Sequence, residues 1–183
     1  MPIIPDTSDW TWVLERACPA CTLRASAVAF DDLPRLIREN AAAWPAVLAR
    51  AEVAVRPDDH TWSPLEYAAH VRDVCRLFEE RLRRILDEEN PMLANWDQDA
   101  TAIAERYDLQ VSETVGLQLV AAANSVADSF AAVPPAARQR TARRSDGPSF
   151  TVETLGSYFL HDIVHHRNDV AADVSVLKPV ETG

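Results

Sequence analysis

Four of the five histidines in this chain fall in two stretches whose apolar residues recur every three or four positions, as they do in amphipathic helices. His70 belongs to the first stretch, and His161, His165 and His166 belong to the second. Residues four apart share one face of a helix, so a pair at that spacing can bind one metal ion. The second stretch offers two such pairs, His161 with His165 and Asp162 with His166. The pattern therefore makes this stretch a candidate metal site.

The helical wheel separates the two pairs. At about 100° per residue, Asp162 and His166 lie at the edge of the apolar stripe that contains Phe159, whereas His161 and His165 lie almost opposite it. A site between helices needs ligands at the edge of the inward face, so the wheel favours Asp162 with His166. The all-imidazole pair is the better generic zinc ligand set, and it stays as the alternative.

His70 also borders an inward face, because Tyr67 and Val74 flank it at helical spacing. His70, Asp162 and His166 would together supply two imidazoles and one carboxylate and leave coordination positions open. Such a set suits Zn²⁺, Fe²⁺ or Ni²⁺ and leaves room for water, a thiolate or substrate. The opposing interpretation is that these are structural residues, since a single histidine at a core edge usually makes an ordinary hydrogen bond.

Four amphipathic helices are predicted to position these residues. The first starts near Asp31 and should kink or restart at Pro45, which removes an N–H donor. The second has a capping box in Ser63-Pro64-x-Glu66 and runs to about Glu89. The others run from about Ser112 to Pro134-Pro135 and from Thr151 through Val170.

No convincing strand or internal repeat appears, so we predict an all-α four-helix bundle with a long crossover connection over residues 90–111. A long excursion in a compact domain is more often functional than idle. Asp97 and Asp99 in this connection, with Arg143 and Arg144 in the polar loop before the last helix, are candidates to line the mouth of a groove. The opposing interpretation is that each is simply a solvated loop charge.

Residues 1–29 are expected to form an ordered N-terminal arm, because Trp10 and Trp12 would bury large apolar areas. Cys18-x-x-Cys21 in this arm could be half a zinc site, a redox pair or a thiol relay. A second such motif is absent, which excludes a closed four-cysteine site within one chain. We expect a structural turn, with both thiols on the surface or beside a helix end. Cys75 lies on an apolar stripe and is expected in the core.

Length and charge narrow the function class. The 183 residues suit one domain, which we divide into the arm (1–29), the bundle (30–175) and a C-terminal tail (176–183). The net charge of −10 would repel phosphate backbones, so nucleic acid is not an expected partner. No apolar run is long enough for a membrane helix, and the N-terminal residues show no secretion signal. Three cysteines are too few for a disulfide framework. We expect a reduced, cytoplasmic protein.

Several of these residues together resemble a known family, the DinB/YfiT-like superfamily, over roughly residues 30–175. The resemblance is carried by Trp62-Ser63, by His70-Val71-Arg72-Asp73 and by Asp162-x-x-x-His166-Arg167-Asn168-Asp169. It implies a four-helix bundle with one divalent metal, commonly zinc or nickel, that three side chains hold in a groove.

Carried over by residue, the resemblance assigns His70 and His166 as ligands. It also puts Asp162 where the family has His or Glu. A shift of one residue would instead use His161 and His165.

The superfamily includes thiol-dependent S-transferases and mycothiol-dependent isomerases. The resemblance therefore implies a metal-dependent S-transferase or isomerase that uses a low-molecular-weight thiol, with mycothiol as candidate co-substrate and a small electrophile as the other partner. A metal cation would lower the pKa of the thiol and present it as thiolate. The alternatives are a metal-dependent hydrolase and a non-catalytic metal-binding stress or binding protein. Whether the chain forms a homodimer is left open.

Overall fold

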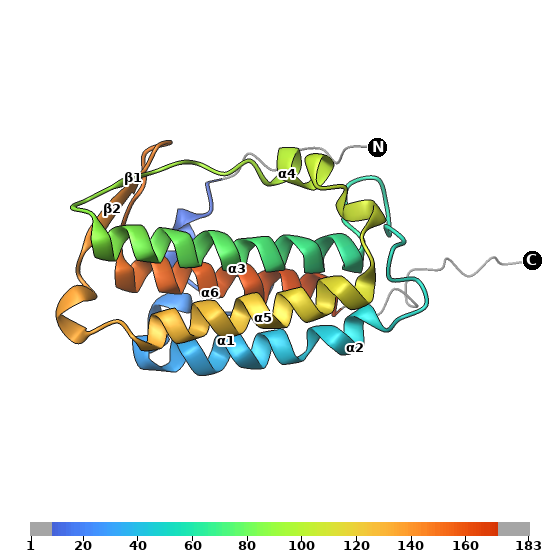
Figure 1. The fold of residues 1–183 in the computed structure, drawn as a ribbon, viewed down its shortest axis with the longest axis horizontal. Coiled ribbons are helices and arrows are strands. Elements are labelled where there is room, and N and C mark those ends of the chain that lie inside the picture. The colour runs from blue at the N-terminus through green and yellow to red at the C-terminus, as the bar shows by residue number, and fades with distance from the viewer. Residues whose placement is uncertain (1–8, 172–183) are drawn as a thin grey trace, which may run out of the picture.

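The computed structural model describes residues 9–171, and the predicted C-terminal tail lies outside them. Four long helices form a bundle, which confirms the predicted fold class (Figure 1). They are α1 (Leu33–Ala42), α3 (Pro64–Asp87), α5 (Ser112–Ala131) and α6 (Val152–Asp169). Two shorter helices, α2 (Trp44–Leu48) and α4 (Gln98–Ala104), extend the first helix and interrupt the long connection.

The helix starts follow the local signals in the sequence. The backbone N–H of Ser63 donates to Glu66 Oε2 at 2.9 Å and the N–H of Glu66 donates to Ser63 Oγ at 3.3 Å, so the predicted capping box is present. A second box joins Thr151 and Thr154 before α6. The predicted break near Pro45 is also present, since α1 ends at Ala42 and α2 restarts at Trp44.

Each long helix packs against two neighbours, in the cyclic order α1, α5, α3, α6. Aromatic rings fill the centre, where the Phe159 ring stacks 5.0 Å from that of Phe78 and 5.9 Å from that of Phe130. Phe159 is therefore the centre of the inward face of α6, as the wheel required. Among the described helices none is long and apolar enough to span a membrane.

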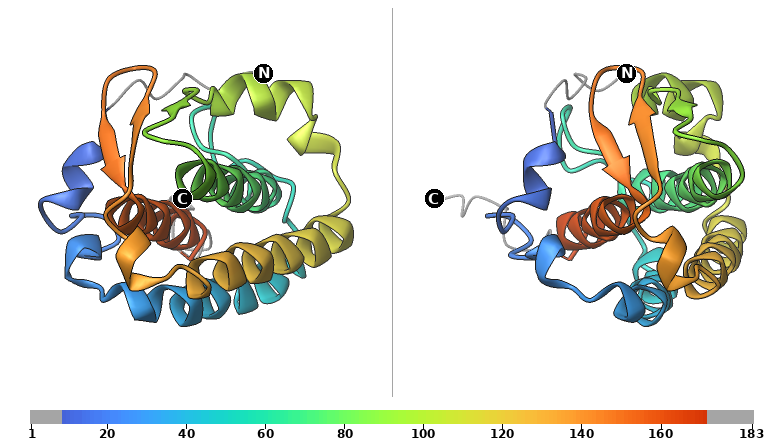
Figure 2. Two further views of the ribbon diagram at one scale, coloured as in Figure 1. Left: turned by 60° about the vertical axis from the view of Figure 1, so that its left-hand side comes forward. Right: turned by 90° about the vertical axis from the view of Figure 1, so that its left-hand side faces the viewer.

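The prediction that no strands occur is wrong for one short sheet. β2 (Thr141–Arg144) pairs in antiparallel fashion with β3 (Ser149–Thr151) and in parallel fashion with β1 (Met92–Leu93). These segments are too short and too polar for a period-two pattern to show, and backbone hydrogen bonds between distant segments form them. The sheet and α4 lie on the same side of the α3–α6 layer, away from α1 and α5 (Figure 2).

The N-terminal arm is ordered over its described residues and lies along α6 (Figure 2). It contains two 3₁₀ turns, η1 (Thr11–Leu14) and η2 (Ala25–Ala27), that pack on that helix. Both thiols of the arm were expected on the surface or beside a helix end; Cys18 is buried, and its Sγ lies 3.6 Å from Nδ1 of His165, four residues before α6 ends at Asp169. Cys21 is half-buried, and Cys75 lies in the core as predicted.

Candidate metal centre

His70 on α3 and Asp162 and His166 on α6 bring three potential ligand atoms within 4.8 Å of one another. Asp162 Oδ1 lies 3.7 Å from His70 Nε2 and 3.6 Å from His166 Nε2. Both distances are too long for hydrogen bonds. Bonds of about 2.1 Å at tetrahedral angles would separate two ligand atoms by about 3.4 Å, so the spacing fits a shared metal ion.

Two members of this trio also carry buried atoms without hydrogen bonds. Nδ1 and Nε2 of His70 and Oδ1 of Asp162 have no hydrogen-bond partner among the described residues, and the His70 side chain is fully buried. Buried polar atoms are nearly always paired, since an unpaired one costs about 1–3 kcal/mol. A metal ion would satisfy His70 Nε2 and Asp162 Oδ1 together, so the residues present fit the metal that the resemblance implies.

The electrostatics give His70 and Asp162 the protonation states of ligands, whereas burial of His166 is outweighed by Asp169 and Asp162, which raise the pKa of that imidazole. Burial lowers the pKa of His70, which keeps the imidazole neutral at pH 7. Burial alone would raise the pKa of Asp162, but His70 and His166 outweigh it and hold the carboxyl below its usual value. A neutral imidazole and an ionised carboxylate are the forms that bind a cation.

Neighbouring side chains orient the trio. Asp169 Oδ2 lies 3.1 Å from His166 Nδ1 and can accept its N–H, which leaves Nε2 for the trio. The His70 ring stacks on Trp96 at 5.4 Å and tilts against Trp62 at 5.2 Å. Trp96 comes from the long connection, and sequence reasoning missed it because no helical period leads there.

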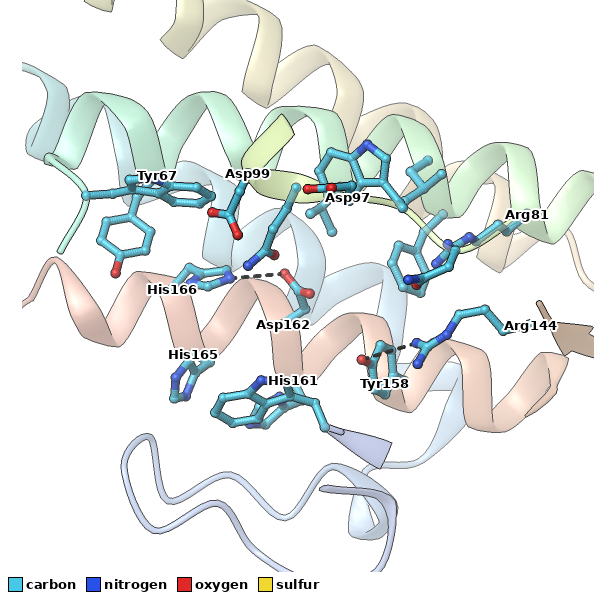
Figure 3. A pocket seen from close by; sticks show the side chains of 18 of the residues that line it. Tyr67, Arg81, Asp97, Asp99, Arg144, Tyr158, His161, Asp162, His165 and His166 are labelled. Carbon is cyan, nitrogen blue, oxygen red and sulfur yellow. Dashed lines mark hydrogen bonds and ion pairs between the residues drawn. The ribbon is translucent and has the colours of Figure 1, made fainter. Parts of the chain in front are cut away.

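Asp162 and His166 line a cavity of about 610 Å³ (Figure 3), and the fully buried His70 lies beside them. Such a volume is typical of sites for small molecules. Of the predicted loop residues, Asp97, Asp99 and Arg144 line this cavity, whereas Arg143 is not among its lining residues. The cavity is therefore bordered by carboxylates from the α4 side and by guanidinium from the sheet.

Arg81 also lines the cavity, and sequence reasoning missed it. It is 7% exposed, packs 5.1 Å over the Phe78 ring and donates to the Ala94 carbonyl at 2.9 Å. Burial, and then the charge of Arg144, lower its pKa to about 10, which still leaves a cation at pH 7. The signal that could have found Arg81 is its position on the face of α3 that also carries Phe78 and Val74.

The alternative pair, His161 and His165, points to the other side of α6 from Asp162 and His166 (Figure 3). Among the described residues, this pair forms a cluster with Cys18 and Cys21 and not with His70. The two histidine-containing pairs of α6 thus belong to two separate clusters of potential ligands.

The fold has a solved counterpart. A structure of YfiT from Bacillus subtilis, described as a probable metal-dependent hydrolase with an unusual four-helix bundle topology, superposes with a TM-score of 0.71. The chain has the DinB/YfiT-like fold. The match covers 79% of this chain and 87% of YfiT at 16% sequence identity. No family model and no curated protein sequence matches the chain.

This DinB/YfiT-like bundle confirms the fold that the Trp-Ser and His motifs implied. At 16% identity the likeness concerns the backbone, so the chemistry has to be argued from the residues of this chain.

Proposed function

We propose that this chain is a metal-dependent enzyme that joins a low-molecular-weight thiol, such as mycothiol, to a small electrophile. The observation that carries the proposal is the trio of His70, Asp162 and His166, whose ligand atoms converge without mutual hydrogen bonds beside a cavity of about 610 Å³ that Asp162 and His166 line. A divalent cation held there would lower the pKa of a thiol at an open coordination position.

The cavity offers complementary groups for a polar thiol and its partner. Arg81 and Arg144 can donate to carboxylate or hydroxyl oxygens, whereas Asp97 and Asp99 can accept from ammonium or hydroxyl groups. Figure 3 shows Asp97 and Asp99 near Asp162 and His166, with Arg81 and Arg144 toward the other end of the cavity. A substrate whose reacting atom lies near Asp162 and His166 could thus contact both sets.

The proposed reaction is a nucleophilic substitution. The thiolate sulfur forms a bond to an electrophilic carbon, and the leaving group departs with the electron pair of the bond that breaks. The thiol proton passes to solvent or to a cavity carboxylate. The chain's part is to position the two reactants, which converts a bimolecular encounter into a reaction within one complex.

The test is a rate measurement on untagged protein, stripped with chelator and reloaded with Zn²⁺, Ni²⁺ or Fe²⁺. We expect conjugation of a bimane or epoxide by mycothiol to depend on the reloaded metal, with glutathione and cysteine compared in parallel. His166→Ala should abolish this acceleration. A metal-loaded protein that accelerates none of these thiols would contradict the proposal.

Metal-assisted hydrolysis is the second candidate. The neighbour YfiT is described as a probable metal-dependent hydrolase, and Asp97 and Asp99 on the cavity wall are groups able to accept a proton from water. Metal-dependent turnover of ester or amide substrates without any thiol would favour this candidate. Binding without turnover in either assay would favour the non-catalytic alternative.

A further inference from the structure

We propose that Cys18, Cys21, His161 and His165 form a second metal site, a closed structural zinc centre that fastens the N-terminal arm to α6. One ligand atom from each residue lies within 4.8 Å of the other three. Two cysteines three apart in a turn and two histidines four apart on a helix supply the four ligands of a tetrahedral Cys₂His₂ site.

The printed geometry matches zinc coordination. Cys18 Sγ lies 3.6 Å from His165 Nδ1. Bonds of about 2.3 Å to sulfur and about 2.0–2.1 Å to nitrogen, at tetrahedral angles, separate these atoms by about 3.6 Å.

A second observation points to a ligand. The Nε2 atom of His161 has no hydrogen-bond partner among the described residues, and the residue is buried, with only 4% of its surface exposed. A thiol–imidazole hydrogen bond between Cys18 and His165 would leave that nitrogen unsatisfied. A shared metal ion accounts for both histidines at once.

The arm presents its two cysteines in a pre-formed turn. The N–H of Thr22 donates to the Cys18 carbonyl at 2.8 Å, and the N–H of Cys18 donates to the Leu23 carbonyl at 2.9 Å. Thr22 takes the left-handed conformation with φ of 62°, which is uncommon for a residue branched at Cβ and reverses the chain after Cys21. This turn conformation is what would allow the thiolates of Cys18 and Cys21 to bind the same ion.

The surroundings resemble the support that metal ligands usually have. Asp169 Oδ1 lies 3.8 Å from His165 Nε2, and a carboxylate beyond the ligand is the common partner for the second ring nitrogen. The Trp10 ring covers His161 at 5.9 Å and His165 at 5.1 Å between ring centroids. This aromatic ring covers part of both imidazoles.

A closed set of four ligands leaves no position for substrate, so the centre is structural. It still affects the cavity, because Trp10, His161 and His165 are also among the residues that line it. The chain would thus bind two metal ions on opposite faces of α6, one with an open site and one with thiolates.

The experiment is cobalt substitution of the full-length, untagged protein, purified under reducing conditions. Bound Co²⁺ should show thiolate-to-metal charge transfer in the near ultraviolet and the intense visible bands of a tetrahedral site. Cys18→Ser combined with Cys21→Ser should abolish the charge transfer, and His165→Ala should weaken Co²⁺ binding at the two thiolates. His70→Ala and Cys75→Ala, which remove a groove ligand and the remaining thiol, should keep it.

A readout on the wild-type protein guards against variants that fail to fold. X-ray absorption of the zinc form should show sulfur at about 2.3 Å and nitrogen at about 2.0–2.1 Å. Two zinc ions per chain are expected by elemental analysis. A Cys18–Cys21 disulfide in the reduced preparation, no sulfur around zinc, or loss of the thiolate band in His70→Ala would overturn the proposal. None of these results depends on whether the groove site catalyses thiol transfer.

Discussion

The two faces of α6 carry two different kinds of site. The groove face presents Asp162 and His166 to His70 on α3, and both elements are helices with a clear apolar period. The opposite face presents His161 and His165 to Cys18 and Cys21, which lie in a turn of the arm. A helical wheel predicts where a side chain points, and it predicts partners only when the partner is also on a periodic element.

The two faces also differ in the ligands that they offer. The groove trio has one carboxylate and two imidazoles, whereas the arm cluster has two thiols and two imidazoles. Soft thiolates favour zinc and a closed tetrahedron, and mixed nitrogen and oxygen ligands admit several metals with open positions. The contrast predicts that removing ligands of the groove trio abolishes activity, whereas removing ligands of the arm cluster lowers the stability of the fold.

The largest expected effect is on stability. Cys18→Ser combined with Cys21→Ser should lower the free energy of unfolding by about 4 kcal/mol at zinc concentrations near 1,000 times the dissociation constant, because the folded state loses a bound ligand. Denaturant unfolding with and without added zinc measures this difference. The control is Cys75→Ala, whose stability loss should not depend on zinc. Equal zinc dependence in the double serine variant and the wild type would contradict the assignment.

The second effect is on turnover. His70→Ala should reduce metal-dependent kcat/KM by at least about 100-fold, because a bound cation lowers the activation barrier by several kcal/mol and each 1.36 kcal/mol is tenfold in rate. Its zinc content should fall by the groove ion alone. His60→Ala is the matched control for metal content, since His60 lines the same cavity outside both clusters. Retained turnover in His70→Ala would show that the groove trio is not the catalytic centre.

The sequence predicted the groove side of the molecule well because its signals are local. Ser63 and Glu66 start α3, and the apolar stripe through Phe159 then sets the direction of Asp162 and His166. The likeness of His70, Asp162 and His166 to the superfamily pattern was visible for the same reason. Their role as metal ligands stays a prediction.

The site residues that could not be predicted from the sequence are brought into place by contacts between segments far apart in the chain. Trp96 reaches His70 from the long connection, and Arg144 reaches the cavity from a hairpin that has no strand pattern. Cys18 meets His165 across 147 residues, and neither the arm nor its turn has a period that indicates which face of the bundle it covers. The wheel put His165 on the other side of α6 from Asp162 and His166, as Figure 3 shows, but it could not show which residues cover that side.

A third prediction concerns the residue that the two faces share. The two carboxylate oxygens of Asp169 face His166 on the groove side and His165 on the arm side. Asp169→Asn should therefore weaken binding of both metals, each by about 10-fold, at the low end for partners of ligating histidines. Competition with a chelator of known affinity measures both constants, and cobalt spectra separate them by the thiolate band.

The outcome for Asp169→Asn sharpens the comparison between the faces. Weaker binding at the groove alone would show that the 3.8 Å contact to His165 is not a supporting interaction. Unchanged binding at both would show that neither histidine depends on this carboxylate. Asp162→Asn is the contrasting variant, since it should weaken the groove ion and leave the thiolate band.

The smallest expected effect concerns the N-terminus of α3, where Ser63 and Glu66 form the capping box. It tests whether this capping box stabilises the metal-free protein. Burial alone would raise the pKa of Glu66, but hydrogen bonds from Arg56 and Ser63 outweigh it and hold the carboxyl below its usual range. A carboxyl with a lowered pKa in the folded state adds stability above its unfolded pKa, near 4.3. That stability is lost as the pH falls through the folded value.

Glu66→Gln should therefore destabilise the protein by roughly 1 kcal/mol at pH 7, a modest value because Arg56 is partly exposed. The difference from the wild type should begin to shrink as the pH falls below the unfolded pKa, near 4.3, and should vanish below the lowered pKa of the folded carboxyl. Urea unfolding of metal-free protein at pH 7 and at pH 3.5 measures it. A difference that persists unchanged at the lower pH would mean that Glu66 acts through packing and not through its charge, and the start of α3 would then owe its position to the core.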